Sequence, residues 1–170
     1  QQGFADTRGT MFFEIERILR HHRPPMLLLE NVKQLATHDG GRTMKVILET
    51  LSEIGYHADW RILNALDFGL PQKRERVIVV GFLDEDYLTK FDWPIGGLPY
   101  DLASILEPDE NLDPKLFASD HIRKKRAESV QGKDLFYPSI WHENKSGNIS
   151  VRDHSCALRT GASYNYLIVN

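Results

Sequence analysis

The chain opens with apolar residues at helical spacing, followed by a short run that is apolar throughout. The apolar positions of the first stretch recur at i, i+3 and i+4 intervals, which predicts a helix through Arg20 that Pro24 stops. They are Phe12, Phe13, Ile15, Ile18 and Leu19. The next run, residues 26–30 (MLLLE), is typical of a strand buried on both faces of a parallel sheet. Polar residues 33–41 then predict a loop.

A second helix and two further strands follow from the next apolar blocks. The helix is predicted to begin at Thr43 and to end at Gly55 as its C-cap. Its buried stripe consists of Met44, Ile47, Leu48, Leu51 and Ile54. Residues 56–63 and 76–82 predict strands that a loop or short turn separates. Helices that alternate with buried strands over residues 10–82 indicate an α/β domain.

The pattern changes after Phe91. Residues 92–114 are rich in Pro, Gly and Asp, which predicts a linker that begins near Trp93. A short basic helix is expected at 119–127, and two short strands are expected within 155–169, around Thr160 and Gly161. We therefore expect two domains, 1–91 and 92–170, of which the second is smaller, irregular and β-rich.

Composition narrows the functional classes only slightly. The net charge is −3 and the pI is about 6.2, which argues against a nucleic-acid coat protein but allows a local basic cleft. The one cysteine, Cys156, permits no internal disulfide and fits a reducing cytoplasm. No apolar run reaches membrane-spanning length. The seven histidines show no metal-ligand spacing with Cys or acidic residues, so we expect no metal site.

Two polar stretches at strand ends are candidates for chemistry. Glu30 follows the apolar run at 26–29, and open α/β sheets place their chemistry at the carboxyl ends of such strands. The alternative is that Glu30 only caps the next turn. Before the strand at 76–82, Arg74 and Arg76 would share one face of an extended chain and could clamp a phosphate, carboxylate or carbonyl oxygen. The alternative is a charged strand entry that forms salt bridges with its neighbours.

Together these stretches resemble the DNA cytosine-5 methyltransferase family. The match runs almost without interruption over residues 5–82, in the order DTRGTMFFEI, ENVKQLATHDGGRT, LNALDFGLPQKRER and RVIVVGF. The resemblance implies a partial S-adenosylmethionine-dependent methyltransferase (Rossmann-like) sheet. Residues 1–91 would form the C-terminal half of the catalytic α/β domain. Residues 92–170 occupy the place of the target-recognition domain, here incomplete.

The resemblance assigns catalytic roles that fit the chemistry. Carbon 5 of cytosine is a poor nucleophile, so these enzymes first add a cysteine thiolate to carbon 6, and negative charge develops on the ring. By resemblance Glu30 holds N3 and the exocyclic amine, and Arg76 stabilises charge on O2, with Arg74 beside it. Asn31 would orient the loop through hydrogen bonds to the backbone. The base must leave the duplex to reach such a pocket.

The resemblance also implies contacts to S-adenosylmethionine and to double-stranded DNA. Met11 stands where the family touches the cofactor's adenine, although a core Met on the first helix is the alternative. Arg8 and Lys33 are candidates for phosphate contacts, each with a solvated surface residue as the alternative. Further candidates for DNA contacts are Gln72, Arg159 and Asn165. The basic run 123–126 could meet the DNA backbone or form a solvated helix face.

The chain departs from the family at its nucleophile. Cys156 lies in HSCALRT, without the preceding proline of the family motif, and is interpreted as a small apolar residue in a strand. We therefore expect a central segment of the enzyme that is inactive alone, and a sheet edge covered by a dimer partner or a complementing chain. The compact motif spacing favours a bacterial restriction-modification system, in the cytoplasm. The alternatives are a catalytically inactive DNA-binding or regulatory module, and an unrelated α/β binding domain.

Overall fold

The computed structural model describes residues 7–157 and 166–169, and the chain divides into two compact units. The first unit comprises Gln1–Asn64 and Glu75–Ile95, and the second comprises Ala65–Arg74 and Gly96–Asn170. The short segment that connects two strands of the first unit therefore belongs with the second. That 1–91 is catalytic and 92–170 recognises the target remains a prediction.

The first unit is built on a three-stranded sheet. Its strands are β1 (Met26–Val32), β4 (Glu75–Phe82) and β2 (His57–Asn64), in the order β1-β4-β2. The expectation of a parallel neighbour for residues 26–30 is wrong, because β4 runs antiparallel to both β1 and β2. The ten residues of Ala65–Arg74 that connect β2 to β4 are fewer than a parallel crossover usually needs.

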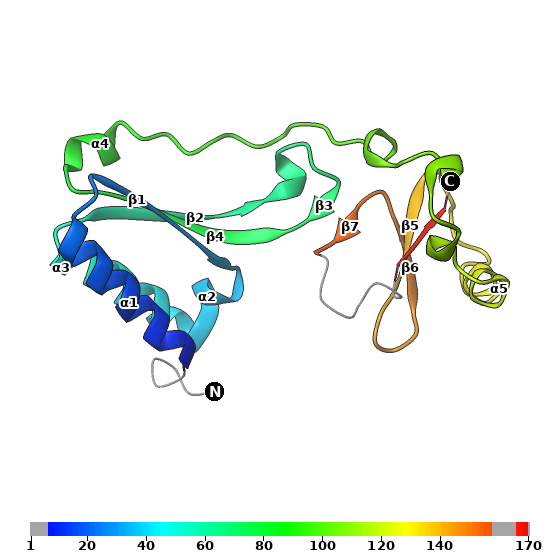
Figure 1. Cartoon of the computed structure of the whole chain (residues 1–170), viewed down its shortest axis with the longest axis horizontal. Coiled ribbons are helices and arrows are strands. Elements are labelled where there is room, and N and C mark those ends of the chain that lie inside the picture. The colour runs from blue at the N-terminus through cyan, green and yellow to red at the C-terminus, as the bar shows by residue number, and fades with distance from the viewer. Residues whose placement is uncertain (1–6, 158–165, 170) are drawn as a thin grey trace. The chain divides into compact units, whose positions relative to one another are not determined.

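Helices α1 (Thr7–His22) and α3 (Arg42–Glu53) lie on the same face of this sheet (Figure 1). Both helices were predicted from their apolar spacing, and Phe12, Leu19 and Leu51 are buried as that spacing requires. The predicted loop at 33–41 is instead helical, with α2 (Gln34–Thr37) followed by a 3-10 turn (His38–Gly41). Because both long helices lie on one face of the sheet, only one face of β1 is covered by them.

Strand β1 is buried on one face only, which corrects the expectation of burial on both. Leu27 is 5% exposed beneath the helices, whereas its neighbour Leu28 is 61% exposed. On the face of the sheet opposite the helices, apolar side chains of the described residues pack over β4 and β2 but not over β1. There Val80 and Phe82 pack against Trp93. The indole Nε1 of Trp93 also donates a hydrogen bond of 2.8 Å to Asp59 Oδ2, so the first unit extends past the predicted start of the linker.

The end of the first unit forms one more helix. This helix is α4 (Glu85–Thr89), and the Asp84 carboxylate caps its N-terminus by accepting a hydrogen bond from the Asp86 N–H.

The second unit holds two small sheets. Strand β3 (Gln72–Lys73) pairs in parallel with β7 (Ser155–Cys156). The other sheet has the order β6-β5-β8 and is antiparallel, with bounds Ile149–Arg152, Ser139–Glu143 and Tyr166–Val169. The basic helix predicted at 119–127 is α5 (Asp120–Ser129). Short 3-10 turns complete the unit at Ala65–Asp67, Ala103–Ile105, Asp109–Asn111 and Pro114–Leu116.

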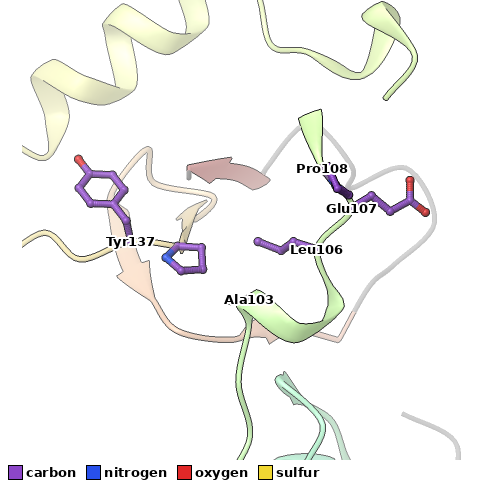
Figure 2. A pocket seen from close by; sticks show the side chains of 6 residues that line it. Ala103, Leu106, Glu107, Pro108 and Tyr137 are labelled. Carbon is purple, nitrogen blue, oxygen red and sulfur yellow. The ribbon is translucent and has the colours of Figure 1, made fainter. Parts of the chain in front are cut away.

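The second unit also has an open pocket of about 380 Å³, lined by residues 103, 106–108, 137 and 138 (Figure 2). Its wall is mainly apolar. In Figure 2 the Leu106 side chain extends toward the side where Tyr137 lies, and the Glu107 carboxylate extends the opposite way. No set of polar groups therefore converges there, and we do not assign the chemistry to this pocket. Of the helices in the described part, none is long and apolar enough to cross a membrane.

Candidate active site

Glu30 and Arg76 form an ion pair across β1 and β4. In the antiparallel register Glu30 lies opposite Ile78 and Val32 lies opposite Arg76, so the acidic and basic side chains are diagonal neighbours on one face. The Arg76 Nε atom lies 2.7 Å from Glu30 Oε1. Two residues that are distant in the sequence are thus brought together where β1 ends and β4 begins.

The pair is accessible on the face of the sheet that the helices leave open. The Glu30 side chain is 49% exposed and that of Arg76 is 21% exposed. The Arg76 Nη1 atom also donates to the Glu75 carbonyl oxygen at 2.9 Å, which fixes the plane of the guanidinium. A carboxyl group beside a planar donor can hold a flat ligand that offers an amine and a ring nitrogen next to a carbonyl oxygen.

Asn31 and Lys33 make contacts close to this pair. The Asn31 Oδ1 atom accepts a hydrogen bond of 2.8 Å from the backbone N–H of Val32, and its expected role in orienting the loop remains a prediction. The Lys33 Nζ atom lies 2.7 Å from Glu75 Oε1. The sequence reasoning missed Glu75 as a partner. Its opposite charge, one position before Arg76, was the only available signal.

Arg74 and Gln72 belong to the second unit. Arg74 is exposed and lies between β3 and β4, so it does not continue the strand that carries Arg76. Gln72 is half-buried in β3, where its Cα is paired with that of Ser155. Their predicted roles beside the base and on DNA remain predictions.

The structure describes only some of the other predicted contacts. Met11 is 67% exposed on α1, so the interpretation as a core residue is wrong, while its contact to the cofactor remains a prediction. Arg8 lies in the first turn of α1, and its side chain is outside the described part of the structure. Arg159 and Asn165 both lie outside the described residues.

The basic run on α5 is not a uniformly solvated face. Arg126 is 3% exposed, and its Nη2 atom lies 3.5 Å from Glu143 Oε2 on β5. Arg123 pairs with Asp120 at 2.5 Å. Because successive helical residues turn by about 100°, four consecutive cations cannot all face the same way. Both interpretations of the run as a single surface are therefore wrong for Arg126.

Cys156 lies in β7, as predicted, but its surroundings are not apolar. It is half-buried, and the Arg152 Nη1 atom donates to its Sγ at 2.8 Å. Within residues 7–157 and 166–169, no group of three or more His, Cys, Asp or Glu side chains is arranged to hold a metal ion.

A small cluster of titratable groups lies elsewhere in the second unit. Asp153 accepts from the Tyr100 hydroxyl at 3.0 Å, and its other oxygen lies 2.7 Å from His154 Nδ1. Burial alone would raise the pKa of Asp153, but the hydrogen bonds from His154 and Tyr100 outweigh it and lower the pKa. Burial and the Asp153 contact raise the pKa of Tyr100. These directions indicate that the hydrogen bonds of Asp153 with Tyr100 and His154 are stronger when Asp153 is ionised.

Two solved structures whose folds resemble this one are methyltransferases. The Entamoeba histolytica methyltransferase EhMeth aligns with a TM-score of 0.56 and 21% identity, over 71% of this chain and 37% of that one. A DNMT2 mutant from Spodoptera frugiperda aligns with a TM-score of 0.53 and 22% identity, over 70% and 37%. The predicted fold class, a partial Rossmann-like α/β methyltransferase sheet with a smaller second part, is confirmed.

The family follows from the sequence comparisons. The family model of C-5 cytosine-specific DNA methylases matches residues 1–158, and the chain belongs to that family. It is 55% identical over 168 residues to the Type II methyltransferase M.HaeII of Haemophilus aegyptius, covering 99% of this chain and 52% of that protein. M.NgoBI of Neisseria gonorrhoeae is 51% identical over the same shares. The chain thus spans about half the length of these curated relatives, and the resemblance drawn from the motifs is confirmed.

Proposed function

We propose that this chain is part of a DNA cytosine-5 methyltransferase of a bacterial restriction-modification system. The substrate is a cytosine within a specific double-stranded DNA site, and the reaction adds a methyl group to carbon 5. Family membership and the Type II methyltransferases among the relatives support this proposal. The single observation that carries it is the accessible ion pair between Glu30 and Arg76.

The two side chains match the polar edge of a cytosine that has left the duplex. The Glu30 carboxyl holds N3 and the exocyclic amine, and the Arg76 guanidinium donates to O2. Both contacts strengthen as the ring accumulates charge during addition of the thiol, so they favour the transition state over the bound base. Asn31 fixes the backbone beside Glu30. Arg74 supports the site or meets a phosphate.

S-adenosylmethionine supplies the methyl group when it is bound. Of this chain's residues, Met11 is the one proposed to meet it, and the observation that fits is its side chain, which is 67% exposed on α1. An exposed, flexible thioether can pack against a flat ring such as adenine. Arg8, Gln72, Arg159 and Asn165 are proposed to contact DNA. The outer edge of β1 pairs with no strand in the described part, and we propose that another strand, from this protein or a second chain, covers it.

We also propose that residues 1–170 do not transfer methyl groups by themselves. Their one cysteine, Cys156, lacks the preceding proline of the family's nucleophile motif. Methyl transfer by the purified 170-residue chain would contradict this.

The test uses the protein that carries this chain and DNA of random sequence. Bisulfite sequencing after incubation with S-adenosylmethionine should show conversion-resistant cytosines within one recurring site. Glu30→Gln should lower the single-turnover rate by about 10²- to 10⁴-fold, the usual contribution of a positioned acid. Glu14→Gln is the control, because Glu14 forms an exposed pair with Arg17 on α1.

An unchanged rate in Glu30→Gln would refute the proposed role of this carboxyl. Site-specific DNA binding without any methylation by the unaltered protein would instead favour the inactive DNA-binding module.

A further inference from the structure

We infer that Lys33 and Glu75 form a positioning pair for the proposed catalytic pair of Glu30 and Arg76. This inference rests on the proposed function. The Lys33 Nζ atom lies 2.7 Å from Glu75 Oε1, with the two side chains 46% and 31% exposed. Lys33 directly follows the last residue of β1, and Glu75 is the first residue of β4.

The ion pair closes the end of the ladder on which the site depends. The last paired residues of β1 and β4 are Val32 and Arg76, so Lys33 and Glu75 extend the register by one position. The β1–β4 ladder ends at Val32 and Arg76, and terminal pairs of a ladder separate most easily, whereas on its other side Glu75 is still paired with Asn64 of β2. The contact therefore limits motion at the strand end that aligns Arg76 with Glu30.

Glu75 acts on Arg76 through its backbone as well. Its carbonyl oxygen accepts from Arg76 Nη1 at 2.9 Å, while its side chain is held by Lys33. Movement of Glu75 would thus rotate the guanidinium away from Glu30. Because side chains alternate along a strand, Glu75 points to the face opposite that of Arg76. Glu75 and Lys33 consequently orient the catalytic arginine without reaching the base it holds.

The geometry differs from the phosphate contact that the sequence suggested for Lys33. An ammonium that neutralises a phosphate adds to DNA affinity and to its salt dependence. An ammonium engaged with Glu75 acts instead on the rate of the chemical step. Affinity and rate can be measured separately, so the two roles are separable.

The test compares Lys33→Met, Glu75→Gln, the double variant K33M/E75Q and the charge-swapped double variant K33E/E75K in the protein that carries this chain. The matched controls are Lys45→Met and Glu49→Gln, which break an exposed pair of 3.6 Å on α3. Single-turnover methyl transfer is measured with DNA and S-adenosylmethionine saturating. DNA dissociation constants are measured across a salt series, together with thermal midpoints.

Each single substitution at 33 or 75 should lower the rate about fivefold, with DNA affinity unchanged within about twofold. The double variant K33M/E75Q should be no slower than either single variant, and the charge swap should recover the rate to within about twofold of the unaltered protein. The controls at 45 and 49 should leave the rate unchanged. A purely structural pair would lower the thermal midpoint and spare the rate at lower temperature.

Two results would overturn the inference. One is an unchanged rate in Lys33→Met and Glu75→Gln. The other is a salt slope of DNA binding reduced by about one in Lys33→Met alone, which marks a phosphate contact. Glu30→Gln, assayed in parallel, distinguishes failure of the positioning role from failure of the proposed function. If Glu30→Gln lowers the rate of methyl transfer while the variants at 33 and 75 leave it unchanged, only the positioning role fails. If Glu30→Gln keeps its rate, the proposed function itself fails.

Discussion

Arg76→Lys should slow methyl transfer greatly while it leaves the fold intact. The guanidinium reaches Glu30 with Nε and the Glu75 carbonyl with Nη1, so two of its atoms are anchored in one plane. A lysine ammonium keeps the positive charge but lacks the rigid fork that holds both anchors while it donates to a ligand. Loss of one oriented donor costs about 10²- to 10³-fold in rate, or about 3–4 kcal/mol of barrier.

The same substitution should change the free energy of unfolding only slightly. The paired side chains of Arg76 and Glu30 are 21% and 49% exposed, so solvent screens their attraction. Such pairs contribute at most about 1 kcal/mol, and a lysine at position 76 retains part of this. The thermal midpoint should therefore fall by less than about 5 °C. A large effect on rate with a small effect on stability is the signature of a catalytic group.

The assay pairs single-turnover methyl transfer with thermal unfolding, both in the protein that carries this chain. Arg61→Lys is the matched control, because Arg61 lies on the same face of the sheet as Arg76. Its guanidinium stacks 5.6 Å from the centre of the Trp93 ring, a contact that lysine can also make. The reasoning is refuted if Arg76→Lys keeps its rate within about threefold, or if its rate loss only follows a loss of folded protein.

Three further substitutions test the second unit. Cys156→Ser should retain methyl transfer within about twofold, since a half-buried strand residue outside the Pro-Cys motif does not attack the base; loss of activity would identify it as a nucleophile. Arg126→Met should lower the free energy of unfolding, measured in urea, by about 1–3 kcal/mol, because the substitution leaves the Glu143 carboxylate without its buried partner. Lys124→Met, at an exposed position of the same helix, is the control and should leave the free energy of unfolding unchanged. Asp153→Asn should lower the free energy of unfolding above pH 3.8, the ordinary pKa of aspartate. Because the pKa of Asp153 in the folded protein is lower, the difference in stability between the two proteins should vanish as the pH falls through that lower value. A difference that does not change with pH would contradict the stabilising hydrogen bonds of Asp153.

Local pattern predicted the helices and strands of the first unit well. The helix expected from Thr43 is α3, which runs over Arg42–Glu53, and the strand expected at 76–82 is β4. Both follow from the spacing of apolar residues within one element. The direction of β4 was not predictable in this way, because a period of two is the same for parallel and antiparallel strands. The one-sided burial of β1 was also missed, since it depends on which elements cover each face.

The candidate site was found from motifs, and its geometry was not. Glu30 and Arg76 emerged because the resemblance joined two stretches that composition alone left ambiguous. Their diagonal relation depends on the pairing register, which no local sequence feature states. Arg126 shows the same limit: a run of cations suggests a surface, but its burial depends on Glu143 from another element. Contacts between helices and strands that are distant in the sequence were therefore not predicted.

The register of β4 joins packing to the proposed chemistry. In the observed register Val77 and Val79 enter the core beneath the helices, and Arg76 lies beside Glu30 on the other face. A slip of one residue would turn the valines outward and exchange the faces of Glu75 and Arg76. Glu75 would then lie near Glu30, and two carboxylates would repel each other where the proposed site needs an acid and a donor that stabilises negative charge. Hydrophobic burial and charge thus favour the same register, so the packing that stabilises the sheet also selects the arrangement proposed to hold cytosine.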